Sequence, residues 1–323
     1  MRYTPFDPQD HGRAFIRSQG HDLQDDLAFL AAHGIALTAN LWQADLFLLC
    51  KYPVMDRRAR WLLRLLRWKP ALIWTDEPRY VPVAEPRMPP QGGLPALHVM
   101  NVYTGDVFLS NITMFGWAIN RRLPYVEEAR LDPFPERSVA ALATYIADPE
   151  RQRFVLNGRD IDLVMPRQEL ILAGHRRGMV DVYGRNWPDG ISRAVSRDGD
   201  WYTAKLDVLQ HYRFNICLEN TNYAYYCTEK IWDSIRGGCL PIYYGAGNRI
   251  YEDFPRGSFI DYADFTSPEA LFAYIAQMSR REYCERMNRC IEVYNRLYER
   301  HDFVAQRERS LLKIVEKVRM LVA

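Results

Sequence analysis

Residues 213–245 read RFNICLENTNYAYYCTEKIWDSIRGGCLPIYYG and place a polar segment between two apolar runs. The first run, at 213–219, is short and rich in apolar residues, as is typical of a strand buried in a parallel sheet. Residues 228–238 have the spacing of a helix that ends at a pair of glycines. A second strand is expected at 239–245. A strand, a helix and a strand in this order predict a βαβ unit.

The same alternation extends to both sides of this stretch. Strands are expected at 44–50, 70–78 and 179–184, and helices at 56–68, 168–178, 205–212 and 267–278. The proline-rich segment 78–95 and the segment 183–201 have the composition of loops. We therefore predict an α/β protein with doubly wound parallel sheets, whose ligands lie outside the carboxyl ends of the strands.

A chain of 323 residues is long enough for two domains of ordinary size. We place an N-terminal domain at 1–150, a C-terminal domain at 151–300 and an amphipathic helix at 301–323, with the crossing around 125–152. The apolar face of the last helix, which includes Leu311, Val315 and Val318, is expected to pack onto the fold. Peripheral membrane attachment is the alternative.

Composition excludes several classes of protein. A formal net charge of +2 argues against a general nucleic-acid binder. The six cysteines form no CxxC pair and have no metal-ligand spacing with histidine, which favours a reducing compartment without a disulfide framework or a metal site. The chain begins with no apolar signal core and has no run long enough to span a bilayer, so we expect a cytoplasmic protein.

The segment 56–68, DRRARWLLRLLRW, predicts a basic amphipathic helix. Trp61, Leu62, Leu65 and Leu66 fall on one side, and the arginines fall largely on the other. A solvated basic face explains this pattern, and contact with an anionic membrane or with an acceptor is the alternative.

Thr228, Glu229 and Lys230 open the predicted helix of the central stretch. A helix N-terminus has unpaired N–H groups and a positive dipole, and therefore accepts an anion. Lys230 can reach a phosphate, whereas Glu229 can accept hydrogen bonds from sugar hydroxyls. With Asn220 and Tyr226 nearby in the sequence, this chemistry fits a sugar joined to a diphosphate. Ordinary first-turn charges and packing explain the same residues equally well at this point.

The order of residues from 205 to 265 closely resembles the C-terminal signature of the α1,3/4-fucosyltransferases, glycosyltransferase family 10, of bacterial type. The matching residues are Lys205, Tyr212-Arg213-Phe214, Leu218-Glu219-Asn220, Tyr226, Thr228-Glu229-Lys230, Pro241 to Gly245, Ser258-Phe259-Ile260 and Asp264-Phe265. This signature of about sixty residues is gapless. Upstream the match is weaker, and Arg167 occupies the place of an arginine that contacts the donor diphosphate.

The resemblance implies a GT-B fold, in which two Rossmann-like domains face each other across a cleft and the C-terminal one holds the nucleotide-sugar. It implies that Arg167 and Lys230 stabilise charge on the departing diphosphate, while Glu229 and Asn220 orient the fucose and the nucleotide. Tyr226 would pack beside them. Lys205, Asn220, Tyr226 and Thr228 are thus expected in substrate binding, and Arg167, Glu229 and Lys230 in catalysis.

Family members use a carboxylate of the N-terminal domain as general base, after a short strand. Glu77, in IWTDEP, holds this place. The usual small residue is here Asp76, and Pro78 follows the acid, so Asp76 itself or Asp106 could serve instead. Two Asp-x-Asp triplets, at 160–162 and 198–200, lie outside the signature and are expected in surface loops.

The resemblance implies an inverting transfer of L-fucose from GDP-fucose to a hydroxyl of an oligosaccharide or lipid-linked glycan, in an α1,3 linkage on a bacterial surface glycan. No cofactor is expected beyond the donor, and stimulation by a divalent cation is left open. A transferase of the same fold that uses another nucleotide-sugar is one alternative. A non-catalytic protein that binds a nucleotide-sugar or glycan is the other.

Overall fold

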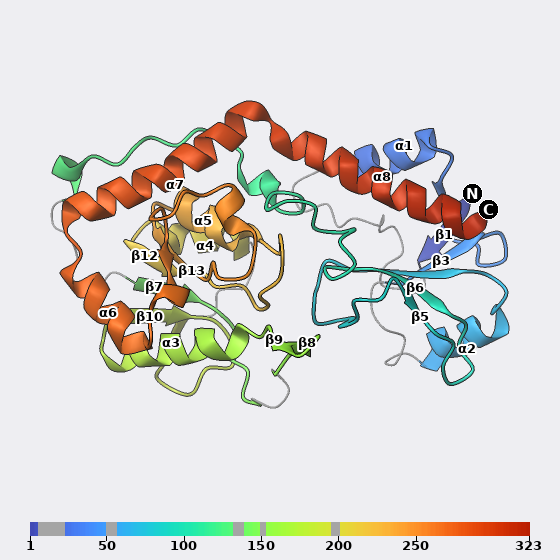
Figure 1. Cartoon of the computed structure of the whole chain (residues 1–323), viewed down its shortest axis with the longest axis horizontal. Coiled ribbons are helices and arrows are strands. Elements are labelled where there is room, and N and C mark those ends of the chain that lie inside the picture. The colour runs from blue at the N-terminus through green and yellow to red at the C-terminus, as the bar shows by residue number, and fades with distance from the viewer. Residues whose placement is uncertain (6–22, 50–56, 132–138, 149–152, 195–200) are drawn as a thin grey trace. The chain divides into compact units, whose positions relative to one another are not determined.

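A computed structural model describes residues 1–323 except 6–22, 50–56, 132–138, 149–152 and 195–200. The described residues form two compact units (Figure 1). Unit 1 comprises Met1–Trp117 and Phe303–Ala323, and unit 2 comprises Ala118–Asp302. The predicted domain boundary at residue 150 therefore differs from the observed division, which falls at Trp117. The helix predicted at 301–323 belongs to unit 1.

Unit 1 contains a sheet of six strands in the order β2-β1-β3-β4-β6-β5. All its pairings are parallel except the one between β5 and β6. Its strands are β1 (Arg2–Pro5), β2 (Ala36–Leu37), β3 (Leu46–Leu49), β4 (Ala71–Trp74), β5 (Arg87–Met88) and β6 (Leu97–Met100). Its α-helices are α1 (Leu23–Ala32), α2 (Arg57–Leu65) and α8 (Asp302–Val322). The short strand β5 lies within the proline-rich segment that was predicted to be a loop throughout.

The apolar side of α8 packs onto unit 1, as expected. Leu311, Ile314, Val315 and Val318 are all buried. The guanidinium of Arg307 on the same helix forms a buried ion pair with Asp26 of α1. The apolar face of α8, for which membrane attachment was the alternative, is therefore buried within unit 1.

Helix α2 forms as predicted, but the four apolar residues expected on one side are not all buried. Leu63 and Leu66 are buried against the core that includes Phe47 and Ile73. Trp61 and Leu65, which were expected to share the apolar face, are instead exposed to 60% and 43%. Helix positions 63 and 66 are three residues apart and lie on one side, whereas 61 and 65 lie on another.

Unit 2 contains a fully parallel sheet of six strands in the order β11-β10-β7-β12-β13-β14. These strands are β7 (Val139–Leu142), β10 (Val180–Tyr183), β11 (Ser192–Ala194), β12 (Phe214–Ile216), β13 (Leu240–Tyr243) and β14 (Ile260–Asp261). A hairpin of β8 (Val155–Leu156) and β9 (Arg159–Asp160) stands apart and turns at Asn157-Gly158, both with positive φ.

Helices cover both faces of the unit 2 sheet. Figure 1 shows α3 (Val164–Arg176) on one side of the strands and α5 (Glu229–Arg236) with α7 (Arg280–Arg300) on the other. The remaining helices are α4 (Trp201–Leu209) and α6 (Pro268–Gln277), which packs against α3. Helix α6 begins as predicted, because the hydroxyl of Ser267 accepts a hydrogen bond from the N–H of Ala270.

Counted along unit 2, the strands of this sheet run 3-2-1-4-5-6. This is the strand order of a Rossmann fold. Strands β7, β10 and β11 follow one another toward one edge of the sheet, and β12, β13 and β14 toward the other, so the switch point lies between β7 and β12. Doubly wound sheets bind ligands in the crevice at that point, beyond the carboxyl ends of the strands. The α/β class and the parallel sheets predicted from the sequence are confirmed.

Candidate functional site

The segment that follows β12 buries a carboxylate. Glu219 is 2% exposed, so its charge needs partners inside the protein. One oxygen accepts a hydrogen bond from the N–H of Thr228 at 2.7 Å, and the other accepts one from the Nζ of Lys230 at 2.9 Å. The hydroxyl of Thr228 lies 2.9 Å from both oxygens. Glu219 therefore joins the end of β12 to the start of α5.

Thr228 is the N-cap residue of α5, and its side chain makes no capping hydrogen bond to the helix. Its hydroxyl instead faces Glu219, and it also accepts a hydrogen bond from the Nζ of Lys230 at 2.7 Å. Lys230 thus has two fixed partners at its ammonium group while its side chain remains 26% exposed. This arrangement holds a positive charge at the edge of a helix N-terminus, where an anion can reach it.

A second charged group lies beside the first. The Nζ of Lys205, on α4, is 2.7 Å from a carboxylate oxygen of Asp233 and 3.7 Å from one of Glu229. Burial acts to lower the pKa of Lys205, but Asp233 and Glu229 outweigh it and raise that pKa. Burial likewise acts to raise the pKa of Glu229, yet Lys230 and Lys205 lower it to about 2. Both groups are therefore charged at neutral pH.

The ammonium of Lys230 shows the same balance. Burial alone would lower its pKa, whereas Glu219 and Glu229 raise it. Both lysines of the site are thus kept protonated by neighbouring carboxylates. A cation held in this way can bind an anionic ligand without first gaining a proton.

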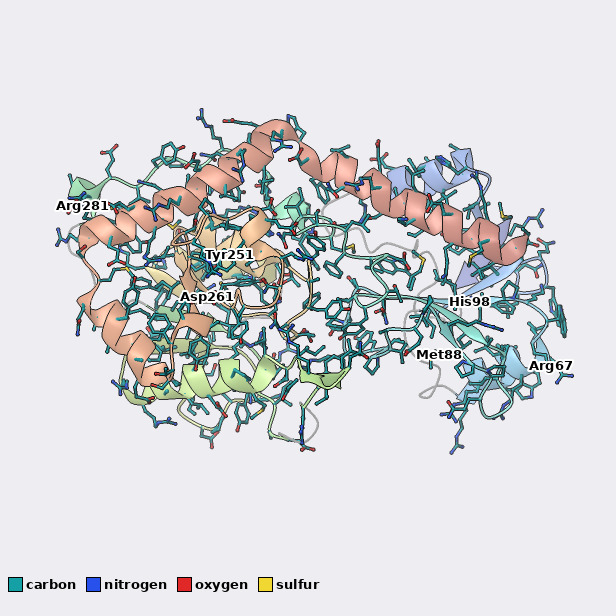
Figure 2. The ribbon with its side chains drawn as sticks, in the orientation of Figure 1. Arg67, Met88, His98, Tyr251, Asp261 and Arg281 are labelled. Atoms are coloured by element: carbon teal, nitrogen blue, oxygen red, sulfur yellow. The ribbon has the colours of Figure 1, made fainter. Side chains whose placement is uncertain are left out.

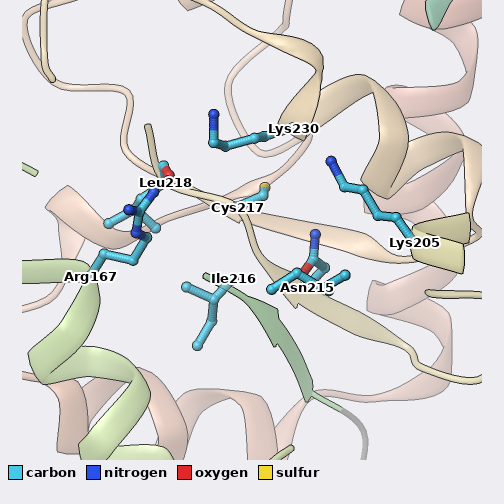
Figure 3. A pocket seen from close by; sticks show the side chains of 8 residues that line it. Arg167, Lys205, Asn215, Ile216, Cys217, Leu218 and Lys230 are labelled. Atoms are coloured by element: carbon cyan, nitrogen blue, oxygen red, sulfur yellow. Dashed lines mark hydrogen bonds between the residues drawn. The ribbon is translucent and has the colours of Figure 1, made fainter. Parts of the chain in front are cut away.

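Three cations line one pocket at the switch point of the sheet (Figure 3). The floor of this pocket comes from Leu142 at the end of β7 and from residues 215–218 at the end of β12. Arg167, Lys205 and Lys230 complete the lining. Three cationic side chains therefore meet where a Rossmann sheet receives its ligand.

Arg167 reaches this pocket from the first turns of α3. Asp162 starts that helix, because its carboxylate accepts hydrogen bonds from the N–H groups of Val164 and Met165, both at 3.0 Å. The guanidinium of Arg167 donates to the main-chain oxygen of Leu218 at 2.9 Å. One arm of the arginine is thus anchored to the end of β12.

The other predicted substrate-binding residues lie around this site without lining the pocket. Asn220 follows Glu219, and its main-chain oxygen accepts a hydrogen bond from Leu163 at 3.1 Å. Tyr226 is 4% exposed and belongs to the core. The structure thus brings Arg167, Lys205, Thr228, Glu229 and Lys230 together, and it leaves a direct contact of Tyr226 with a ligand as a prediction.

The predicted general base lies in unit 1. Glu77 follows β4 closely, as the sequence indicated, and is partly buried. Its carboxylate accepts a hydrogen bond from the N–H of Arg79 at 3.3 Å. Asp76 and Asp106, the alternatives, are also partly buried. None of these acids is assigned a role by the structure alone.

Two residues that the sequence did not assign to the site are central to it. Glu219 was part of the recognised triplet, but only the structure shows that its carboxylate turns toward Lys230. Asp233 lies one turn after Glu229 and is fully buried beside Lys205. A polar residue on the buried side of an amphipathic helix was the available signal for Asp233.

The first Asp-x-Asp triplet has a structural role, since Asp162 caps α3. The second triplet, at 198–200, lies outside the described residues. Among the residues with described positions, no group of three or more His, Cys, Asp or Glu side chains is placed to hold a metal ion. Within the same part of the chain, no helix has the length and apolar character needed to cross a membrane.

Comparison with known proteins identifies the segment that carries this site. Residues 166–296 match the model of "Glycosyltransferase family 10 (fucosyltransferase) C-term". These residues form a glycosyltransferase family 10 domain. The match confirms the resemblance inferred from the sequence, and it covers all of the residues that line the pocket except Leu142. The bacterial type stays a prediction.

Parts of the chain are similar to curated fucosyltransferases of an animal and of a plant. An alpha-(1,3)-fucosyltransferase 4 of Rattus norvegicus is 36% identical over 107 residues, which are 32% of this chain and 23% of that protein. An alpha-(1,4)-fucosyltransferase of Arabidopsis thaliana is 37% identical over 81 residues, or 25% of this chain and 20% of that protein. The chain thus spans less than a quarter of the length of these relatives.

Two solved fucosyltransferase structures align with most of this chain. A crystal structure of an alpha1,3-fucosyltransferase is 18% identical to this chain, with a TM-score of 0.46, and the alignment covers 88% of this chain and 80% of that one. A second such structure, with GDP-fucose, has 16% identity, a TM-score of 0.45 and the same coverage.

Proposed function

We propose that this protein is an inverting glycosyltransferase that transfers L-fucose from GDP-fucose to a hydroxyl group of an oligosaccharide acceptor. The observation that carries the proposal is the convergence of Arg167, Lys205 and Lys230 on one pocket at the switch point, inside the family 10 domain. Several fixed cations stabilise a diphosphate, and three line this pocket.

In the proposed reaction, the acceptor oxygen attacks the anomeric carbon of fucose as the bond between that carbon and the diphosphate oxygen breaks. The acceptor proton passes to a carboxylate, for which Glu77 is our candidate. The electron pair of the broken bond leaves with GDP. Lys230 and Arg167 then stabilise the charge that develops on the diphosphate.

The carboxylates that pair with the two lysines support this role in stabilising the diphosphate. Glu219 and Asp233 fix the two ammonium groups in place, so that their positions need not be reorganised when charge develops. Glu229 is ionised at neutral pH because its pKa is lowered to about 2, and it can therefore accept hydrogen bonds from sugar hydroxyls.

We extend the proposal to the biological context expected from the sequence. The acceptor would be an oligosaccharide or lipid-linked glycan of a bacterial surface, fucosylated in an α1,3 linkage by a cytoplasmic enzyme. Lipopolysaccharide synthesis and protein glycosylation are the processes that use such acceptors. Neither a metal ion nor another cofactor is required in this proposal.

Donor selectivity tests the proposed function. The full chain is incubated with GDP-fucose, UDP-galactose or UDP-N-acetylglucosamine and a panel of glycan acceptors, and nucleotide release and product mass are followed. Acceptor-dependent release of GDP from GDP-fucose alone is the expected result. Turnover of a UDP-sugar would show that GDP-fucose is not the donor. Tight GDP binding without turnover would favour the alternative of a non-catalytic protein that binds a nucleotide-sugar.

A further inference from the structure

Helix α2 and its flanks carry a cluster of exposed aromatic side chains. Trp61 is 60% exposed, Leu65 43% and Trp68 66%. Positions 61, 65 and 68 are spaced by four and three residues, so they follow one side of the helix and of the turn that continues it. Exposed side chains of this size and number in one place are uncommon in a protein surface that faces only water.

A loop adds a third tryptophan to the same edge of unit 1. Lys69, directly after Trp68, donates hydrogen bonds to the main-chain oxygens of Leu41, Trp42 and Ala44, at 3.1, 2.7 and 2.6 Å. These bonds fix the loop of residues 40–44 against the end of α2. Trp42 on this loop is 68% exposed.

The same segment is strongly basic. Residues 57–69 contain six Arg or Lys and no Asp or Glu, although the whole chain has a net charge of only +2. Arg57 and Arg67 are exposed, and Figure 2 shows Arg67 at the rim of unit 1. Leu63 and Leu66 fix the helix to the core from its other side. The basic and aromatic side chains therefore remain at the surface.

We propose that this surface, the α2 patch, binds the headgroup region of an anionic lipid bilayer. The α2 patch consists of Trp42, Arg57, Trp61, Leu65, Arg67 and Trp68. Tryptophan rings settle at the boundary between headgroups and acyl chains, where one end of the ring is apolar and the other is hydrated. Arginines beside them pair with lipid phosphates, and each basic group near an anionic surface strengthens binding.

Charge and shape together select this partner. A glycan can stack on a tryptophan, but a neutral glycan gains nothing from the exposed aliphatic Leu65 or from the charges of Arg57 and Arg67. The partner surface must be apolar and anionic at once, and a bilayer with acidic headgroups is both. The sequence left membrane contact open for both α8 and the segment of α2; the apolar face of α8 is buried within unit 1, whereas the α2 patch is exposed.

Vesicle binding tests the proposal with the full chain. Flotation is measured with vesicles of phosphatidylcholine alone and with vesicles in which about one third of the lipid is phosphatidylglycerol. We expect binding to the anionic vesicles, weakening as salt is raised, together with a blue shift of tryptophan emission. Equal binding to both kinds of vesicle, or binding to neither, would overturn the proposal.

Paired variants locate the contact. Trp61→Ser/Trp68→Ser and Arg57→Glu/Arg67→Glu should each lower the vesicle partition coefficient at least about tenfold. Tyr125→Ser and Arg281→Glu alter exposed residues elsewhere and should leave the coefficient unchanged. Melting temperatures of all four variants should match the parent, because the altered side chains are exposed.

Other occupants of the patch would give different results. If the tryptophan variant bound vesicles normally but raised KM for a glycan acceptor, the patch would be an acceptor site and the proposal would fail. If it changed the oligomeric state instead, the patch would be a contact between two copies. The proposal is independent of the donor, since vesicle binding is measured without GDP-fucose.

Discussion

Lys230 serves the site in two ways, as a candidate phosphate ligand and as the counter-ion of Glu219. The ammonium group lies 2.9 Å from a carboxylate that is 2% exposed. We expect Lys230→Ala to weaken GDP binding by about 1–3 kcal/mol, through the loss of a charged hydrogen bond. The same change should lower the free energy of unfolding by about 1–3 kcal/mol, because it leaves Glu219 buried with fewer partners.

A double variant separates these two effects. Lys230→Ala combined with Glu219→Gln removes both charges and should recover part of the lost stability but none of the GDP affinity. Calorimetric titration with GDP and chemical denaturation provide the two measurements. If Lys230→Ala alone binds GDP like the parent, Lys230 has a structural role only.

Glu77 is the residue on which the proposed chemistry depends in unit 1. Glu77→Gln keeps the shape of the side chain but removes its basicity, so fucose transfer should be lost. GDP affinity should stay near that of the parent, since the pocket cations all belong to unit 2. Asp76→Asn and Asp106→Asn are the matched controls, and they should retain activity. If Glu77→Gln is active and one of the two aspartate variants is inactive, that aspartate is the general base instead.

The residues of the site could be read from the sequence only in part. The order of Lys205, Thr228, Glu229 and Lys230 indicated their common site, and the structure brings these side chains together. Which carboxylate faces which lysine could not be read, because that depends on how β12 and α5 meet. Thus Glu219 and Asp233 were missed as partners of the lysines, while a contact of the buried Tyr226 with a ligand stays a prediction.

At the scale of elements, α3 shows how tightly the unit 2 layers meet. Gly174 lies in the last turn of this helix, and a Cβ atom there would overlap side-chain carbons of Val180 and Phe272. Alanine favours a helix over glycine by about 1 kcal/mol, but overpacking in a core costs about 1–3 kcal/mol. We expect the steric cost to dominate, because β10 and α6 hold these two neighbours from both sides.

Gly174→Ala should therefore lower the stability of the protein, as measured by denaturant unfolding. A companion change, Phe272→Leu, enlarges the space next to position 174. The loss caused by alanine should be smaller in that background than in the parent. A single Gly174→Ala variant that is as stable as the parent would show that α3 can shift away from its neighbours.

Elements with strong periodic patterns were predicted well, and those that depend on context were not. Helix α6, with Ser267 at its N-cap, begins where the sequence indicated. Strand β7 has the sequence VAAL and lies within 125–152, where the sequence predicts the crossing between domains; alanine has low strand propensity and so gives little sign of a strand. The spacing of apolar side chains in α2 does not tell which of them are buried: Leu66 is in the core, whereas Trp61 and Leu65 are exposed.

At the scale of the whole molecule, the two units differ in how the chain builds them. Unit 2 is one continuous segment, whereas unit 1 is completed by α8, which returns after residue 302. Arg307 of α8 and Asp26 of α1 form a buried ion pair that joins the two parts of unit 1. A domain boundary that depends on a returning helix cannot be read from local sequence patterns.

The continuous course of unit 2 predicts that it folds by itself. It has its own six-stranded sheet with helices on both faces, and all eight residues that line the pocket lie within it. A protein of residues 118–302 should therefore show cooperative thermal unfolding and bind GDP with an affinity close to that of the full chain. It should transfer no fucose, because Glu77 is absent from it. Calorimetric titration and circular dichroism provide the measurements, and a fragment that folds but fails to bind GDP would place part of the donor site in unit 1.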